Sequence, residues 1–273
     1  MKITYFGTAA AEAVPTPGCE CAVCRHARKT GGRNTRLRTQ ALIDDRLLID
    51  FPADAHYFSI RYGVNYLRIA GCLISHSHSD HLCAPDLVSF DHGFCATDRE
   101  EPLHFFAGED GFRHIRKTET DLSVGRRDVT LIEPFRPFTV AGYEITPLPA
   151  NHAPTSSPLI FHIRSGEKSM VWAHDTGILP DAAAEALAAL GRVDFFSLDC
   201  CLPFLSGIRQ GHLSIDTCEE TFANLTARGV IDGKTVCVLN HFSHNGGATQ
   251  DDLESFCREK PYIPAYDGMT ITF

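Results

Sequence analysis

Residues 71–81 read GCLISHSHSDH, a short apolar run followed at once by a cluster of polar side chains. The apolar part predicts a short buried strand that ends at His76. His76 and His78 are two positions apart, so at a strand end their rings can point to one side and bind one ion. Asp80 and His81 follow on a turn and can reach a second ion beside it. Four nitrogen and carboxylate ligands within six residues favour a site for Zn, Mn or Fe over a solvated polar loop.

Three more segments place polar side chains after strand-like apolar runs. They are Asn151-His152, His174-Asp175-Thr176-Gly177 and Asn240-His241. Each precedes a loop, where a scaffold commonly presents its functional groups. A single histidine of this kind is usually structural, but the repetition predicts that these residues complete the metal site.

The composition bounds the class of protein. The chain has 273 residues, 44% of them apolar, and a formal charge of −9. These values are typical of one large α/β domain or two small ones, and they exclude disordered, collagen-like and coiled-coil chains. No apolar run approaches the ~18 residues of a membrane span, and the first residues lack a signal-peptide core, so we expect a cytoplasmic protein without membrane contact. The acidic balance argues against broad nucleic-acid binding.

The cysteine pattern predicts a second metal site. The chain contains 11 Cys and 14 His, and three of the thiols fall within residues 19–24, CECAVC. In a reducing compartment such cysteines are thiols or metal ligands. A C-x-C-x2-C loop can surround one zinc ion, which then needs a fourth ligand, either His26 or His244. We expect the other eight cysteines to be mostly core residues.

The pattern of apolar residues predicts many strands with interspersed helices, and residues 18–38 are expected to form a Cys-rich loop. Residues 40–50 predict a hairpin that turns at Asp44-Asp45. The other strands are expected at 2–7, 71–75, 103–107, 158–164, 168–174, 193–199, 235–240 and 269–273, and the helices at 84–92, 181–190, 215–228 and 250–259. Residues 129–149 also alternate in the manner of strands, with interruptions at Pro134, Pro137 and Pro147. This arrangement indicates two packed sheets with helices outside, in a single domain over residues 1–273.

The order of the motifs resembles that of the metallo-β-lactamase superfamily. Asp50, HSHSDH, His152, the Asp175 of HDTG and His241 match its five motifs in sequence. The resemblance implies an αββα sandwich with two mixed sheets and two divalent active-site metals (Zn, Mn or Fe). It implies that one metal is held by His76, His78 and His152, and the second by Asp80, His81 and His241. Asp175 would bridge both metals, Asp80 would also belong to the catalytic group, and Asp50 would orient the metal loop by hydrogen bonds.

Within the superfamily the chain looks similar to the PhnP-like phosphodiesterases. The similarity lies in GCECAVC at 18–24, LNHFSHN at 239–245 and the closing YDGMTITF. It implies a structural zinc held by Cys19, Cys21, Cys24 and His244, which favours His244 over His26. This zinc would join the N-terminal loop to the strand end that carries His241.

The same similarity suggests roles for residues outside the metal ligands. His212 lies just before a helix capped by Ser214, and in PhnP-like enzymes a histidine at this place serves as general acid. The segment 25–38 is rich in Arg and Lys. Most of these cations are expected to be solvated, and Arg36 and Arg38 are the candidates for contact with a phosphate-bearing substrate.

We therefore predict a metal-dependent hydrolase of small or cyclic phosphodiesters. A hydroxide held by two metals would attack phosphorus, and His212 would protonate the leaving alkoxide. Three different functions would also fit the motifs: a lactone or thioester hydrolase, a tRNA-processing-type nuclease and a PqqB-like cofactor-biosynthesis protein. Only 37 positions separate Asp175 from His212, which leaves little room for an RNA-binding arm. The expected partner is a small phosphodiester, and a homodimer is left open.

Overall fold

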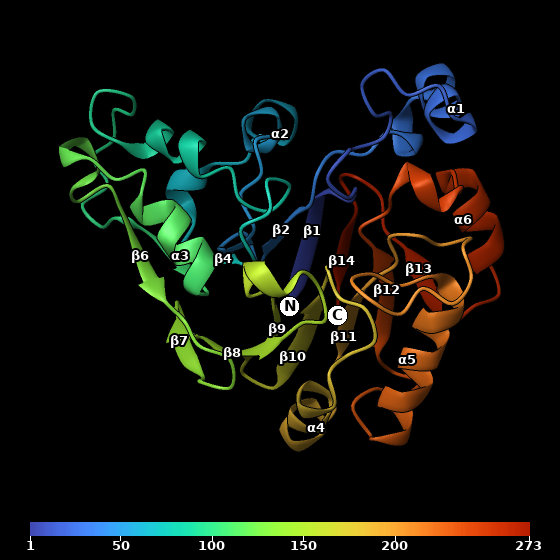
Figure 1. Ribbon diagram of the computed structural model, residues 1–273. Helices are drawn as coiled ribbons and strands as arrows, with labels where there is room; N and C mark the ends of the chain where they lie inside the picture. Colours follow the sequence, from blue (N-terminus) through green and yellow to red (C-terminus); the bar gives the residue numbers. More distant parts are fainter.

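Two seven-stranded β-sheets face each other in the computed structural model, which describes residues 1–273 (Figure 1). The first sheet has the order β14-β1-β2-β3-β4-β5-β6 and the second the order β13-β12-β11-β10-β9-β8-β7. The strands of the first sheet are β1 (Lys2–Gly7), β2 (Gln40–Ile43), β3 (Leu47–Ile49), β4 (Gly71–Ile74), β5 (Leu103–Ala107), β6 (Arg127–Leu131) and β14 (Thr270–Thr272). Those of the second are β7 (Phe138–Val140), β8 (Tyr143–Pro149), β9 (Leu159–Ser165), β10 (Lys168–Ala173), β11 (Phe195–Asp199), β12 (Val236–Asn240) and β13 (Tyr262–Pro264).

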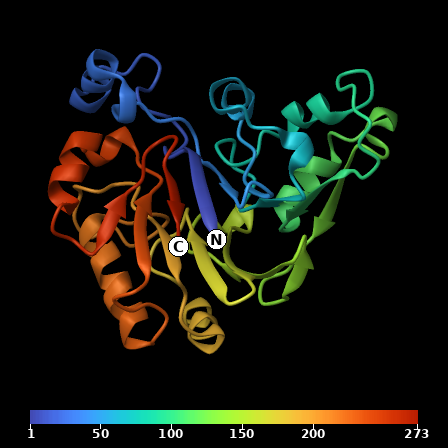
Figure 2. The same cartoon turned by 180° about the vertical axis from the view of Figure 1, so that it is seen from behind.

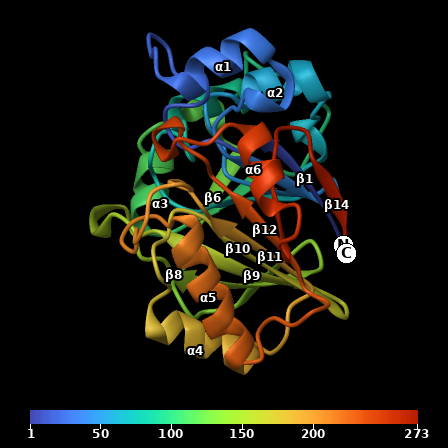
Figure 3. The same ribbon diagram turned by 90° about the vertical axis from the view of Figure 1, so that its right-hand side faces the viewer.

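Helices cover the outer face of each sheet, which gives the expected αββα sandwich (Figure 3). The α-helices are α1 (Ala22–Thr30), α2 (Ala55–Tyr62), α3 (Glu109–Arg116), α4 (Asp181–Leu190), α5 (Ile215–Ala227) and α6 (Gln250–Cys257). Short 3₁₀ turns occupy Gly32–Asn34, Tyr66–Arg68, Ala84–Phe90, Asp121–Ser123, Pro154–Ser156 and His244–Gly246. None of the six α-helices has the length and apolar character that crossing a bilayer requires.

The inner core fills the space between the two sheets. It includes Tyr5 of β1 and Trp172 of β10, whose rings stack with centroids 5.8 Å apart. Both side chains are fully buried. Aromatic contacts of this kind join the two sheets because each ring comes from a different sheet. The chain ends also meet here: the Met1 amino group donates to the Phe273 carbonyl at 3.0 Å.

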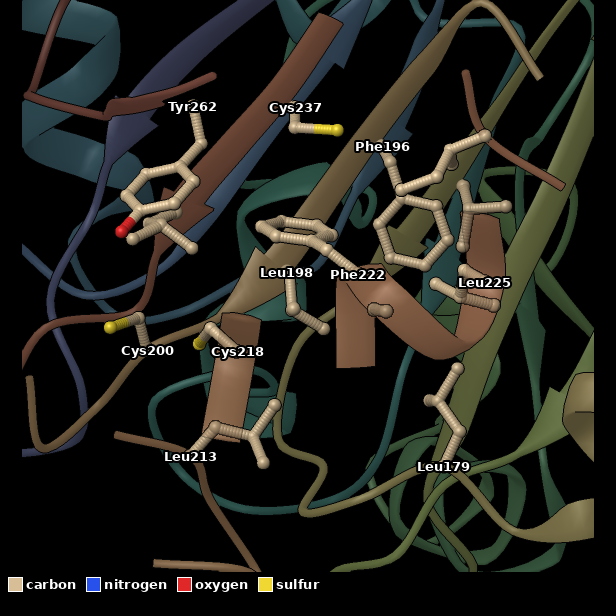
Figure 4. Close-up of a cluster of buried hydrophobic side chains, with 14 of the residues drawn as sticks. Leu179, Phe196, Leu198, Cys200, Leu213, Cys218, Phe222, Leu225, Cys237 and Tyr262 are labelled. Carbon is tan, nitrogen blue, oxygen red and sulfur yellow. The ribbon is translucent and has the colours of Figure 1, made fainter. Parts of the chain in front are cut away.

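An outer core packs α5 against the second sheet (Figure 4). Cys218, Phe222 and Leu225 of α5 are spaced by four and three residues, so they share one helix face. That face meets Phe196 and Leu198 of β11. The packing fixes the start of α5, so the segment immediately before it has a defined place above the sheet.

Strand direction brings the functional segments to one edge of the sandwich. Strands β3, β4 and β5 run parallel, as do β10, β11 and β12. Strand β8 is antiparallel to β9, and β9 is antiparallel to β10, so β8 points the same way as β10. The carboxyl ends of like-directed strands meet at one edge, where ligand sites commonly form. The segments that follow these ends carry Asp50, Ser75, His152, Asp175, Asp199 and His241.

Most predicted elements are confirmed; the sequence analysis missed strand β13, and the other exceptions are helices. The hairpin turns at Asp44 and Asp45, whose φ angles of 48° and 58° match the left-handed central residues of a type I′ turn. The predicted helix over 84–92 is a 3₁₀ turn, and both α2 and α3 were missed. The prediction of a loop over 18–38 was wrong, because α1 lies inside it. Cys21 caps α1, and only a small cluster including Val23 is buried beneath it, so its apolar signal is weak.

Candidate metal centre

Two groups of potential ligands lie at the carboxyl edge of the strands. One contains His76, His78 and His152, and the other contains Asp80, His81, Asp175 and His241. Within each group the ligand atoms lie within 4.8 Å of one another. All seven residues were predicted as ligands, and the structure brings them together from four separate strand ends. His78 Nδ1 and His152 Nε2 are 3.2 Å apart, close enough to share one ion.

Asp175 lies between the two groups. Its Oδ1 is 3.1 Å from His241 Nε2 and 3.7 Å from His152 Nε2. Its Oδ2 contacts His81 Nε2 and is 3.8 Å from His76 Nε2. The residue follows β10 with a φ of 49°, a left-handed conformation that an aspartate tolerates better than most residues. One carboxylate therefore faces both groups, which is the geometry of a bridging ligand.

The side-chain atoms that point into the site are better suited to binding metal ions than to forming hydrogen bonds with one another. His76 Nε2, His81 Nε2 and Asp175 Oδ2 are buried and form no hydrogen bond of normal geometry, although the last two atoms are in contact. Buried polar atoms without partners are rare because desolvating them is costly. Three such atoms converging on one place, with imidazole and carboxylate chemistry, match the donor set of a dinuclear site for Zn, Mn or Fe.

The outward-facing ring nitrogens are held by the protein, which orients the inward ones. His81 Nδ1 lies 2.6 Å from Asp50 Oδ2, and His241 Nδ1 lies 2.8 Å from Thr39 Oγ1. His152 Nδ1 donates to the carbonyl of Gly211 at 2.9 Å. A proton on Nδ1 leaves the Nε2 lone pair free, as in most metal-bound histidines.

Ser75 and Asp50 form the support beneath the histidines. Asp50 is fully buried and accepts hydrogen bonds from the backbone N of Ser75 at 2.8 Å and from its hydroxyl at 3.0 Å. The same hydroxyl lies 3.2 Å from His76 Nδ1 and 3.1 Å from His81 Nδ1. Asp50 thus occupies the orienting position that the sequence suggested. The sequence analysis missed Ser75, although its place directly before the motif was a usable signal.

The pKa values of the residues in the site depend on burial and on the contacts between carboxylates and histidines. Burial lowers the pKa of His76 well below its usual value, and neighbouring His81 adds to the effect. For His81, burial is outweighed by Asp175 and by other nearby carboxylates, and its pKa is raised. Burial opposes ionisation of Asp175, but His241 and His81 outweigh it and lower its pKa. The site therefore keeps its carboxylates ionised, as cation binding requires.

His212 lies beside this site and is held by a residue that the sequence analysis missed. Its Nδ1 lies 3.0 Å from Asp199 Oδ2 and 3.5 Å from Asp175 Oδ1. Asp199, at the end of β11, also accepts hydrogen bonds from the backbone N of Asp175 at 3.1 Å and of Leu213 at 3.0 Å. Burial lowers the pKa of His212, but the charge and hydrogen bond of Asp199 outweigh burial and raise the pKa to about 12. His212 is thereby kept protonated and fixed in direction.

The three cysteines lie close to His244, the residue that the similarity to PhnP-like enzymes favoured as their fourth partner. Cys19, Cys21, Cys24 and His244 place their ligand atoms within 4.8 Å of one another. His244 Nδ1 is 3.4 Å from Cys21 Sγ and 3.6 Å from Cys19 Sγ. Burial alone would raise the pKa of Cys21, but hydrogen bonds from the Cys24 backbone and His244 lower it to about 6. The donor set suits a tetrahedral zinc site, and His26 lies elsewhere, 2.9 Å from Asp251.

The two arginines proposed for substrate contact occupy different environments. Arg36 is 3% exposed, and its guanidinium donates to Thr8 Oγ1 at 2.5 Å, to the Ala265 carbonyl at 2.8 Å and to Gln250. This burial contradicts the predicted substrate contact, because every one of these bonds is internal. Arg38 is partly exposed and pairs with Asp54 at 2.7 Å. The carboxylate of Asp80 also acts on Arg38, so this side chain lies near the metal site.

Comparisons with known proteins identify the family of this chain. A sequence model described as a beta-lactamase superfamily domain matches residues 57–232. The chain belongs to the beta-lactamase superfamily. The match spans the HSHSDH motif, His152, Asp175 and His212, and it leaves out the cysteine cluster and His241. Membership makes metal-dependent hydrolysis the general class of chemistry for this site, and it implies divalent metal binding.

Solved structures share the whole fold at low sequence identity. A diphosphatase from the PhnP family has a TM-score of 0.74 and 21% identity, covering 100% of this chain and 97% of its own. Zinc-bound PqqB from Methylobacterium extorquens has a TM-score of 0.76 and 18% identity, covering 100% of both chains. The short form of human tRNase Z has a TM-score of 0.67 and 15% identity, covering 100% of this chain and 99% of its own. No curated protein sequence matches the chain.

Proposed function

We propose that this superfamily member is a phosphodiesterase that acts on small or cyclic phosphodiesters. The observation that carries the proposal is the pair of His212 and Asp199 beside the bridging carboxylate of Asp175. Hydrolysis of an alkyl phosphodiester releases an alkoxide, a poor leaving group that needs a proton. A protonated histidine held at the edge of the site meets that need.

The chain's own residues would divide the work as follows. Two divalent ions, held by His76, His78 and His152 and by Asp80, His81 and His241 with Asp175 between them, would supply Lewis acidity and a water of lowered pKa. Asp199 holds the Nδ1 proton of His212, so the opposite nitrogen is the atom that donates. The attacking water would lose one proton to solvent as its oxygen bonds to phosphorus, and the bond to the leaving oxygen would break as that oxygen takes the proton from His212. His212 then returns to its charged state from solvent.

Arg38 is the proposed contact for a phosphate oxygen. Its Nε and Nη2 are bonded to Asp54 at 2.7 and 3.2 Å. The remaining Nη1 is the donor available to a ligand. Asp54 precedes α2 and also accepts from the backbone N of Arg38 at 3.0 Å, so the guanidinium is held in one direction. A fixed guanidinium is well suited to phosphate because it presents directional donors.

We also propose that Cys19, Cys21, Cys24 and His244 bind a structural zinc ion. The support lies in the four converging donors and in the lowered pKa of Cys21. His244 is three residues from His241, so a zinc ion here would hold the chain on which a proposed active-site ligand lies. Its proposed role is positional and not catalytic.

A lactone or thioester hydrolase would use the same metal centre. A thioester releases a thiolate, which leaves readily without a proton, whereas a lactone releases an alkoxide that needs one, so only the thioester reaction has less need of His212. A tRNA-processing-type nuclease and a PqqB-like protein of cofactor biosynthesis would also share the fold. The complete ligand set supports a working hydrolase over a binding protein. Assaying a dialkyl phosphate, a ribose cyclic phosphate and a lactone side by side separates these classes.

The experiment that tests the proposal is the His212→Ala variant with two kinds of ester. A nitrophenolate leaves without help, whereas an alkoxide does not. We expect kcat to fall by roughly 10²–10⁴-fold for an alkyl or cyclic phosphodiester and much less for a nitrophenyl ester. Metal content is measured in both proteins. If the metals remain and both esters lose rate equally, His212 binds phosphate and does not donate a proton.

A further inference from the structure

A cavity with a volume of about 540 Å³ is lined by residues other than the proposed metal ligands. Residues 13–15 and 32–37 form one wall, and residues 57, 61 and 62 of α2 contribute to another. Residues 266 and 267, in the turn before β14, also line it. Figures 1 and 2 show α1 and α2 at one end of the molecule, with β1 between them. The volume falls within the roughly 300–1,000 Å³ typical of small-molecule sites, and no proposed metal ligand lines it.

The cavity carries an excess of positive charge. Its lining contains three guanidinium groups, those of Arg33, Arg36 and Arg61, and one carboxylate, that of Asp267. Arg36 is buried and Asp267 is half-buried, and both are bonded to neighbouring protein groups, so their charges largely offset each other. Arg61 has no ion pair with a carboxylate. In a chain with a net charge of −9, this local excess favours an anionic ligand.

Arg33 is also available to an anionic ligand, although the carboxylate of Glu254 lies beside it. Its guanidinium is 3.3 Å from Glu254, and the two side chains are 58% and 43% exposed. Exposed pairs of this kind are weak and open readily. The same guanidinium lies 4.0 Å from the centroid of the Tyr266 ring. A flat cation on an aromatic face is a platform that can continue a stack.

Aromatic side chains supply the remaining surface. Tyr57 is 49% exposed and lies one helical turn before Arg61, so ring and guanidinium share a face of α2. Tyr62 is held by stacking on Phe6, with centroids 5.5 Å apart. Exposed tyrosine beside a charged cavity provides a rigid face for a planar ring and a polar end for water.

We propose that this cavity binds a planar aromatic anion of the nucleoside monophosphate class. The phosphate would bind Arg61 and Arg33, and the base would stack against Tyr57 or Tyr266. The site is independent of the proposed phosphodiesterase activity. Arg36 and Leu37 line the cavity, and Thr39, two residues on, contacts His241. A ligand here would therefore rest on the segment that also supports the metal centre.

The test is calorimetric titration of the full-length, metal-loaded protein with AMP, with adenosine and inorganic phosphate as separate arms. We expect one AMP per chain, bound more tightly than either half alone. Arg61→Glu should weaken AMP binding by at least about ten-fold, since it reverses a charge that contacts the phosphate. Tyr57→Ala should weaken it through the loss of stacking. Arg68→Glu, an exposed arginine outside the cavity lining, is the matched control and should leave binding unchanged.

A second arm separates this cavity from the metal centre. Titration is repeated in the presence of saturating dialkyl phosphate and in the His212→Ala protein, and we expect AMP binding to persist in both. Because Arg61 and Tyr57 are exposed, unchanged melting temperatures verify that their variants fold. The proposal is overturned by an absence of AMP binding, by binding that dialkyl phosphate abolishes, or by binding that Arg61→Glu leaves intact. Inorganic phosphate binding as tightly as AMP would also overturn it.

Discussion

Asp199 accepts a hydrogen bond from His212 Nδ1 at 3.0 Å through its Oδ2, the same oxygen that accepts from the backbone N of Asp175. One buried carboxylate therefore sets both the direction of the proposed acid and the position of the proposed bridging ligand. The other oxygen, Oδ1, accepts from the backbone N of Cys201 and of Leu213, each at 3.0 Å. These four donors fix Asp199 relative to the start of α5.

Replacing Asp199 should impair the proton donor. Asp199→Asn removes the charge that raises the pKa of His212, so less of the histidine is protonated and its ring is less firmly oriented. We expect kcat for an alkyl phosphodiester to fall by roughly 10²–10⁴-fold, with a smaller loss for a nitrophenyl ester. Asp232→Asn, an exposed carboxylate, is the control. The double variant with His212→Ala should lose little more than His212→Ala alone, and additive losses would show that the two residues act separately.

Chelation should distinguish two kinds of metal. The histidine and carboxylate site lies at the edge of the sandwich and has no thiolate ligand, whereas the cysteine site has thiolate ligands that hold zinc tightly. Mild treatment with a chelator should remove about two ions and abolish hydrolysis while about one zinc per chain remains. Metal analysis and thiol titration check this. Three reactive thiols at Cys19, Cys21 and Cys24 in the untreated protein would contradict the structural zinc.

Cys21→Ser should act on stability. Loss of one sulfur ligand weakens a structural zinc site, and zinc binding contributes directly to the free energy of folding. We expect a lower melting temperature and about one zinc fewer per chain. Cys95→Ser, at a half-buried thiol outside the cluster, serves as the control and should change neither. An unchanged melting temperature in Cys21→Ser would count against a structural zinc.

Asp267 should make stability depend on pH. Burial raises the pKa of its carboxyl to about 7, above the ~3.9 of an unfolded aspartate. Between these values the folded chain binds more protons than the unfolded chain, so the free energy of unfolding should fall as pH rises through this window. The free energy changes by ~1.4 kcal/mol per pH unit for one proton, so the contribution of Asp267 to the free energy of unfolding should decline by about 2–3 kcal/mol from pH 5 to pH 8.

Urea unfolding of the wild type and of Asp267→Asn at the two pH values measures that contribution. The asparagine variant does not titrate, so its pH dependence should be flatter and the gap between the proteins should shrink or reverse at pH 8. Equal pH slopes would show that Asp267 remains ionised beside Arg36.

The sequence alone determined the strand-end motifs and, through them, the fold. These motifs are local patterns: an apolar run forms a strand, and polar residues such as HSHSDH follow at its end. The structure has the strands and the polar residues in these places. The predicted helix over 250–259 is likewise confirmed as α6, whose capping box, with Thr249 Oγ1 accepting from the backbone N of Asp252 at 3.1 Å, involves only neighbouring residues. The helix α1 was not predicted, because few of its side chains are buried and the cysteines in this segment indicate a metal site instead of a helix.

Only the tertiary structure decided which distant residues meet. The residues alone left His26 and His244 open as the fourth partner of the cysteines, and the chain path places His244 beside Cys21 although 223 positions separate them. Arg36 and Arg38 lie in the same basic segment, yet one is buried and the other is half-buried and paired with Asp54. Asp199 belongs to no motif that the sequence analysis recognised. Its role arises because β11 lies between β10 and β12, so the end of β11 lies beside Asp175 and His212. Local sequence specifies the chemistry of each strand end, whereas strand order and helix packing determine which ends share a site.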